Sequence, residues 1–188
     1  MVTLRKIREI IISPSGYLEE IRDRPIKDDV LFFIVVAVVG SILMFFSMVI
    51  GEIVTGKGDS LNPAGIPVMI LTILFLFVVN GLFFMLIISL IEHFFVLFTG
   101  EHKGFERTMK SVIYASVLPV VFFWIPAVFH IPSSILLLAG AFCIVTFYGI
   151  LTFHEKAKDR AAFVALFTTG FILILLWLGK VNITGNAW

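Results

Sequence analysis

Histidine and carboxylate side chains gather near the ends of long apolar runs in this sequence. His93 and His154 each lie at the end of such a run, and His102 lies in the polar stretch after the earlier one. Imidazole nitrogens and carboxylate oxygens are ligands for divalent metals. None of these histidines has a second histidine four residues away, the spacing that puts two ligands on one helix face. His93, His102 and His154 are therefore kept as metal candidates, while no bound metal or cofactor is expected.

A pair of glutamates followed by an arginine could take part in catalysis. Glu19, Glu20 and Arg24 form an EExxxR string that resembles the first motif of the intramembrane CAAX-type proteases. In those proteases the glutamates lie inside a membrane helix, where burial raises a carboxyl pKa and the group can activate water. Here the string lies in a polar stretch, and no histidine is followed at the fourth position by Asp or Asn, as the third motif requires. The chain is not expected to be an enzyme.

Composition places the chain in a membrane. Of its 188 residues, 60% are hydrophobic and 14% are charged, whereas a soluble domain carries about 25% charged residues. The net charge of +1 also argues against nucleic acid as a partner, because binding to phosphate backbones needs clustered basic residues. The single cysteine, Cys143, excludes a disulfide within the chain.

Apolar runs long enough to cross a membrane occur five times. A helix needs about 20 apolar residues to span the hydrocarbon core, and helices satisfy every backbone polar group within their own segment. The sequence therefore predicts an all-α membrane bundle with five transmembrane helices. They are expected at Val30–Gly51, Ile66–Ile91, Ser111–Phe129, Ser133–Phe153 and Ala161–Gly179.

The positive charges predict how the bundle is oriented. All but two of the 14 Lys and Arg residues fall on one side of these five runs, and the exceptions are Lys57 and Lys180. Because positive residues concentrate in cytoplasmic segments, we expect a cytoplasmic N-terminus and an external C-terminus. The expected domains are a cytoplasmic segment at 1–29, the five-span domain at 30–180 and a short external tail at 181–188.

The N-terminal segment has an amphipathic pattern of its own. Its apolar residues fall on one helical face, interrupted by Pro14, and basic residues lie elsewhere. A basic amphipathic segment favours the surface of an anionic leaflet, so an interfacial helix and contact with anionic lipids are expected. The apolar residues of the stripe are Leu4, Ile7, Ile11, Tyr17, Leu18 and Ile21.

A few polar residues fall within or beside the apolar runs. Asn80 lies in the middle of the second run and Glu92 directly follows it, while Tyr114 and Tyr148 lie in the third and fourth. Polar groups inside a membrane are functional candidates, although Asn80 is also expected to bond a neighbouring helix. Pro119 has no amide hydrogen to donate to the Ala115 carbonyl, so a kink is expected there, with the Asn80 amide as the replacement donor.

The middle of the chain is similar to the core of the Ypt-interacting protein (Yip) domain family. Members show a span that ends in His, a Gly-rich turn, a Phe-x-x-Thr helix start and a Tyr-Ala…Pro span. The matching residues here are His93, Gly100, Gly104, Phe105, Thr108, Tyr114, Ala115 and Pro119. Two further matches are Ser13-Pro14-x-x-Tyr17-Leu18 and Tyr148-Gly149-Ile150-x-x-x-His154. The two glycines let the chain reverse after the second run, and Thr108 or Ser111 is expected to cap the third.

This resemblance implies a scaffold or adaptor rather than an enzyme. Eukaryotic relatives interact with Rab-type GTPases, associate with one another and act in vesicle traffic. The 29 residues before the first run are fewer than those relatives have, which argues against a small GTPase partner. The resemblance instead implies a short prokaryotic member in the cell membrane, with self-association or other membrane proteins as partners. The alternative is a small transporter or ion pathway formed by oligomerised bundles, favoured by Asn80 and the kink but not by any Asp, Lys or Arg inside a run.

The orientation predicts which introduced cysteines a membrane-impermeant reagent can reach. With Cys143 replaced by serine, Lys103→Cys should react only after cells are permeabilised, because position 103 is expected in the cytoplasm. Lys180→Cys, on the expected outer side, should react in intact cells and is the matched control. Labelling of position 103 in intact cells would refute the orientation.

Overall fold

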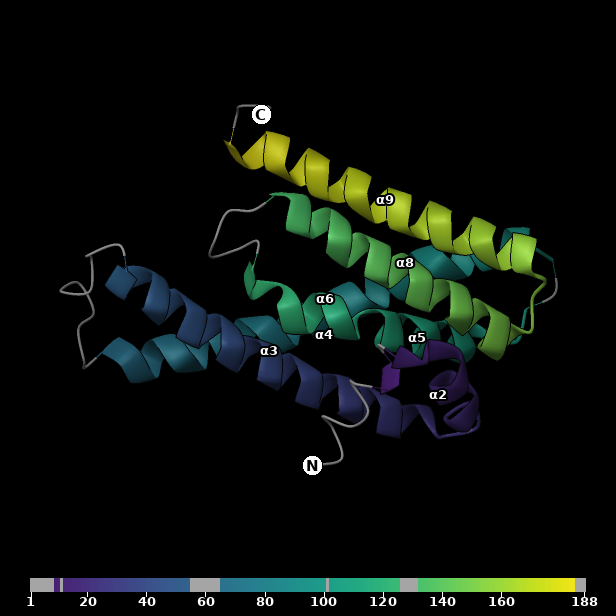
Figure 1. Ribbon diagram of the computed structural model, residues 1–188, viewed down its shortest axis with the longest axis horizontal. Helices are drawn as coiled ribbons and strands as arrows, with labels where there is room; N and C mark the ends of the chain where they lie inside the picture. Colours follow the sequence, from purple (N-terminus) through teal and green to yellow (C-terminus); the bar gives the residue numbers. More distant parts are fainter. Residues whose placement is uncertain (1–8, 11, 55–64, 101, 126–131, 185–188) are drawn as a thin grey trace.

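The computed structural model describes residues 9–10, 12–54, 65–100, 102–125 and 132–184. Its labelled elements are all helices, which confirms the all-α class. The elements are α2 (Pro14–Glu20), α3 (Ile26–Val54), α4 (Ile66–Phe98), α5 (Phe105–Ala115), α6 (Val117–Phe122), α8 (Pro132–His154) and α9 (Lys158–Thr184). In Figure 1, α3 and α4 form one pair of long helices and α8 and α9 another, while α5 and α6 pack between them.

Four helices are long and apolar enough to cross a membrane. They cover Ile26–Glu52, Ile66–Phe98, Ser133–His154 and Lys158–Leu178, and they correspond to four of the five predicted runs. Several boundaries differ from the prediction, and two of the differences bear on the site described below. The first helix begins at Ile26, so it includes Asp29, and α4 continues beyond Ile91 to Phe98. At 1.5 Å per residue, the 33 residues of α4 extend about 50 Å, longer than the hydrocarbon core.

The predicted third span is divided. Helix α5 ends at Ala115 and α6 begins at Val117, with Ser116 between them. The backbone amide of Ser116 donates to Val112 and that of Val120 donates to Ser116, while Pro119 has no amide hydrogen for the Ala115 carbonyl. The interruption therefore falls where the proline predicts a kink. The remainder of this span, from residue 126, lies outside the described residues, and the five-span count stays a prediction.

The expectation that the Asn80 side chain points into the bundle is wrong. Its side chain is exposed on α4, whereas Ala115 is fully buried. The neighbouring Gly81 is the residue that faces the bundle, with Phe33 next to it. The helical register thus turns the amide of Asn80 away from the interior, so it is not the donor expected for the Ala115 carbonyl.

The N-terminal segment also differs from the expectation. Tyr17, Leu18 and Ile21 are buried in the main hydrophobic core, and α2 packs on α8. Burying a large apolar side chain contributes about 1.5–3 kcal/mol, so this stripe contacts protein rather than the apolar part of a leaflet. Pro14 does begin a new helix, as its position predicted. The other residues of the expected stripe, Leu4, Ile7 and Ile11, lie outside the described residues.

Close helix contacts depend on two glycines. A Cβ atom at Gly40 in α3 would lie 2.7 Å from the Val120 carbonyl oxygen of α6. A Cβ atom at Gly149 in α8 would lie 2.5 Å from the Ser111 hydroxyl oxygen of α5. Both distances are shorter than van der Waals contact, so α5 and α6 reach their places only because these positions have no side chain.

Gly40→Ala should destabilise the bundle, because the nearest obstacle is a backbone atom that cannot rotate away. Overpacking of this kind costs about 1–3 kcal/mol. Gly140→Ala is the matched control, because nothing lies within 4 Å of a Cβ atom there. Thermal unfolding in detergent should show a lower midpoint for Gly40→Ala and an unchanged or higher one for Gly140→Ala. Equal midpoints for the two variants would mean that α3 and α6 are not in close contact.

Candidate functional site

A buried lysine joins the N-terminal segment to α5. The Lys110 side chain is 2% exposed and lies 3.7 Å from the Asp29 carboxylate. Its ammonium group donates to the Arg22 carbonyl at 3.0 Å and to the Arg24 carbonyl. Arg22 and Arg24 follow the end of α2 at Glu20, and Pro25 has no amide hydrogen to donate. The carbonyls of Arg22 and Arg24 therefore need hydrogen-bond donors from another part of the chain. Lys110 supplies them.

The partner carboxylate of Lys110 is itself held by a tyrosine. The Tyr114 hydroxyl donates to Asp29 at 2.5 Å, and the ring of Tyr114 stacks on Phe32 and meets the edge of Tyr17. Burial raises the pKa of Tyr17 to about 12, so this phenol stays neutral and adds no charge beside the ion pair. Tyr114, predicted as a polar residue of the third span, thus binds the first residues of α3.

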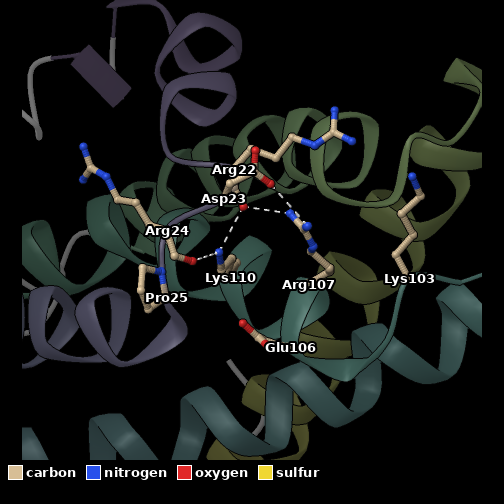
Figure 2. Close-up of a pocket in the computed structure, with 8 residues that line it drawn as sticks. All are labelled: Arg22, Asp23, Arg24, Pro25, Lys103, Glu106, Arg107 and Lys110. Carbon is tan, nitrogen blue, oxygen red and sulfur yellow. Dashed lines mark hydrogen bonds and ion pairs between the residues drawn. The ribbon is translucent and has the colours of Figure 1, made fainter.

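A polar pocket opens beside this ion pair. It has a volume of about 270 Å³ and combines basic residues with two acidic ones. Figure 2 shows the Lys110 and Arg107 side chains directed at the stretch from Arg22 to Arg24. Arg107 donates to the Arg22 carbonyl at 2.7 Å and lies 3.5 Å from the Asp23 carboxylate. The lining residues are Arg22, Asp23, Arg24, Pro25, Lys103, Glu106, Arg107 and Lys110.

Glu155 lies beyond the pocket, in the turn between α8 and α9. Its carboxylate forms ion pairs with both Arg22 and Lys103. Its backbone has a φ of 53°, the one positive value found for a residue other than glycine in the described part of the chain. A left-handed conformation of this kind is held by surrounding contacts, so the turn is tied to the N-terminal segment on one side and to the start of α5 on the other.

Two of the three candidate histidines meet at a threonine. The Thr108 hydroxyl lies 2.9 Å from Nδ1 of His93 and 3.1 Å from Nε2 of His154. The Lys103 amide donates to Nδ1 of His154. A neutral His154 therefore carries its proton on Nε2 and donates it to Thr108, which donates in turn to His93. The chain of bonds joins α4, α5 and the end of α8.

This arrangement does not form a metal centre. The ring of His102 lies against His93 with 5.3 Å between ring centres, and its Nδ1 accepts a bond from the Gly104 amide. A hydroxyl separates the nitrogens of His93 and His154, so the rings do not converge on a shared ion. Among the described residues, no group of three or more His, Cys, Asp or Glu could hold a metal.

The two glycines of the turn before α5 have the backbone expected of them. Gly100 has a φ of 93° and Gly104 a φ of 90°, values that favour glycine. Gly104 is also the N-cap of α5. The expectation that Thr108 or Ser111 caps this helix is wrong, because both lie inside α5 and their hydroxyls face other helices.

The remaining candidates occupy different surroundings. Glu92 is fully buried, and its carboxyl oxygens have no hydrogen-bond partner among the described residues. Tyr148 is half-buried and packs against the main core, with its ring against Phe147. Pro119 is half-buried in α6. None of these three shares a bond with the network around Thr108 or Lys110.

Sequence reasoning missed the central roles of Lys110 and Asp29. In the sequence, Lys110 is one of the positive charges between the second and third runs, and Asp29 is the last residue of the expected cytoplasmic segment at 1–29. One signal was present: Lys110 and Tyr114 are four residues apart, which places them on one helix face. No spacing in the sequence relates either of them to Asp29, which lies more than 80 residues earlier in the chain.

Comparison with known families gives one match. The sequence model that describes the Yip1 domain matches residues 8–179. No curated protein and no solved structure matches the chain.

Removal of one hydroxyl tests the buried ion pair. Tyr114→Phe leaves an Asp29 oxygen buried without its donor, which costs about 1–3 kcal/mol. Tyr148→Phe, in a half-buried tyrosine of α8, is the matched control and should change stability by much less. Unfolding by heat in detergent measures both. If the two variants unfold alike, the Tyr114–Asp29 bond does not stabilise the fold.

Proposed function

The chain belongs to the Yip1 domain family, and we propose that it acts as a non-enzymatic membrane scaffold or adaptor. Its apolar helices make it a multi-pass membrane protein with surfaces that contact lipid. The proposal concerns the end of the bundle that carries α2, the start of α5 and the turn at Glu155. We call this end the cap.

The observation that carries the proposal is the way the cap uses its polar groups. Asp29, Lys110 and Tyr114 bond to one another or to backbone carbonyls, and Thr108 joins two histidines. These side chains, which have the chemistry needed for catalysis, hold helices together instead. A cap of this kind presents a surface of defined shape, which suits recognition of a partner better than turnover of a substrate.

The exposed part of the cap carries charges of both signs. The Asp23 side chain is 86% exposed, and Lys103 and Glu155 are about half as exposed. Glu106 is exposed as well. Charges of alternating sign steer and orient protein partners, while Arg22, Arg24 and Lys103 suit contact with anionic lipid headgroups. The expected cytoplasmic orientation, which the positive charges favour, would turn this surface to the cell interior.

The alternative of a transporter has less support. One residue that favours it in the sequence, Asn80, has a side chain that is exposed on α4 rather than lining the interior of the bundle.

Charge reversal at the cap tests the adaptor function. A tagged chain is purified from its native membrane, and bound proteins and lipids are identified by mass spectrometry. The double variant Asp23→Lys/Glu106→Lys changes two exposed acids and should leave folding intact, yet its bound proteins should fall at least tenfold. Ser133→Glu, which adds a charge at the opposite end of α8, should keep them. A wild-type chain that binds nothing above an unrelated membrane protein would contradict the proposal, as would equal binding by all three chains.

A further inference from the structure

Four buried polar side chains, each from a different helix, have no hydrogen-bond partner among the described residues. All four are fully buried. Other hydroxyls in the bundle behave differently, since Ser47 and Ser89 donate to carbonyls one turn earlier in their own helices. That local bond is the usual solution for Ser and Thr in membrane helices. Four fully buried side chains without such a bond are Glu92 in α4, Ser111 in α5, Thr146 in α8 and Thr168 in α9. The Thr169 hydroxyl, in a residue that is 8% exposed, also lacks a partner among the described residues.

The helical register places three of these side chains in one layer. Val96, Ile150 and Val164 share a hydrophobic cluster, which fixes the level of α4, α8 and α9 relative to one another. Glu92, Thr146 and Thr168 each lie four residues from a member of that cluster. Helices α4 and α8 run in the same direction and α9 runs in the opposite one (Figure 1). Glu92 and Thr146 come four residues before their cluster members, and Thr168 comes four residues after its own. All three therefore lie on the same side of the cluster, away from the cap. At 1.5 Å per residue, four residues move each side chain about 6 Å along its helix.

The fourth side chain enters the layer from α5. The Ser111 hydroxyl lies near the Glu92 carboxyl, although the two complete no hydrogen bond. It also lies against Gly149, where a Cβ atom would come within 2.5 Å of it. Gly149 directly precedes Ile150 of the cluster. The absence of a side chain at Gly149 is thus what lets the Ser111 oxygen reach this layer.

Of these four side chains, Glu92 is acidic and none is basic. Lys110, next to Ser111, is directed to the carbonyls of Arg22 and Arg24, on another face of α5. An ionised carboxylate buried without a countercharge is costly. One positive charge balances it, whereas a divalent ion would leave an excess. Carboxylate and hydroxyl oxygens favour hard cations over the softer metals that bind nitrogen and sulfur.

We propose that Glu92, Ser111, Thr146 and Thr168 form an interior site for a small monovalent cation of the sodium class. The carboxylate supplies the charge and the three hydroxyls supply neutral oxygen ligands. The site joins four helices, so its occupation stabilises the folded bundle. Its four side chains are distinct from those of the Lys110 pair and the Thr108 network, although Ser111 directly follows Lys110 and Glu92 directly precedes His93. The site does not depend on the adaptor function of the cap.

Ion-dependent unfolding of the full chain tests the site. The purified protein is heated in detergent at pH 8 in NaCl, KCl or N-methylglucamine chloride at equal ionic strength. A ligand that binds only the folded state raises the unfolding midpoint as its concentration rises. The midpoint should therefore increase and saturate with NaCl, and increase less with KCl. A wild-type midpoint that is the same in all three salts would overturn the proposal.

Single substitutions locate the effect. Glu92→Gln keeps the shape of the side chain and should abolish the sodium-dependent shift, whereas Glu106→Gln, an exposed acid, should retain it. Thr168→Val removes one ligand oxygen and should raise the sodium concentration at half-effect about tenfold. Thr169→Val alters the next residue of α9, on another helix face, and should leave that concentration unchanged. A sodium-dependent shift that persists in Glu92→Gln would exclude this layer as the site.

Discussion

The buried ammonium group of Lys110 determines how the N-terminal segment attaches to the membrane helices. A lysine inside a protein needs a countercharge and acceptors for its protons, and here Asp29 and two backbone carbonyls provide them. The carbonyls use this lysine in turn, because Arg22 and Arg24 lie between α2 and α3, outside the hydrogen-bond pattern of either helix. Each side therefore depends on the other. The apolar residues Tyr17, Leu18 and Ile21, just before this stretch, are buried in the main hydrophobic core.

Helix α5 is the element through which the rest of the bundle is connected. Its residues from Ser111 to Ala115 are all buried, although Ser111 and Tyr114 are polar, because α3, α4 and α8 surround the helix. One face directs Lys110 and Tyr114 to the N-terminal segment. Another directs Thr108 and Ser111 to α4 and α8. A short polar helix in this position needs partners on every side, and the surrounding long apolar helices supply them with a few well-placed polar groups.

The two polar regions around α5 have different physical consequences. Around Lys110 and Thr108 the polar atoms are largely bonded to one another, which gives a rigid cap with charged residues on its surface. Around Glu92 the polar atoms have no partner among the described residues, which favours a small ligand. The proposed adaptor function and the proposed cation site are compatible, since a cation in the interior would stabilise the bundle that presents the cap.

The sequence by itself determined the all-α membrane class, four of the apolar helices, the glycine turn at Gly100 and Gly104, and the family. Each follows from local composition, or from a backbone conformation that few residues adopt. Tertiary structure alone decided that Lys110 pairs with Asp29, that Thr108 lies between His93 and His154, and that Asn80 faces outward. Such contacts join residues from distant parts of the chain, or depend on the rotation of a helix about its axis. In a run that is apolar on all sides, such as α4, the pattern of residues does not specify that rotation, and only packing against neighbouring helices sets it.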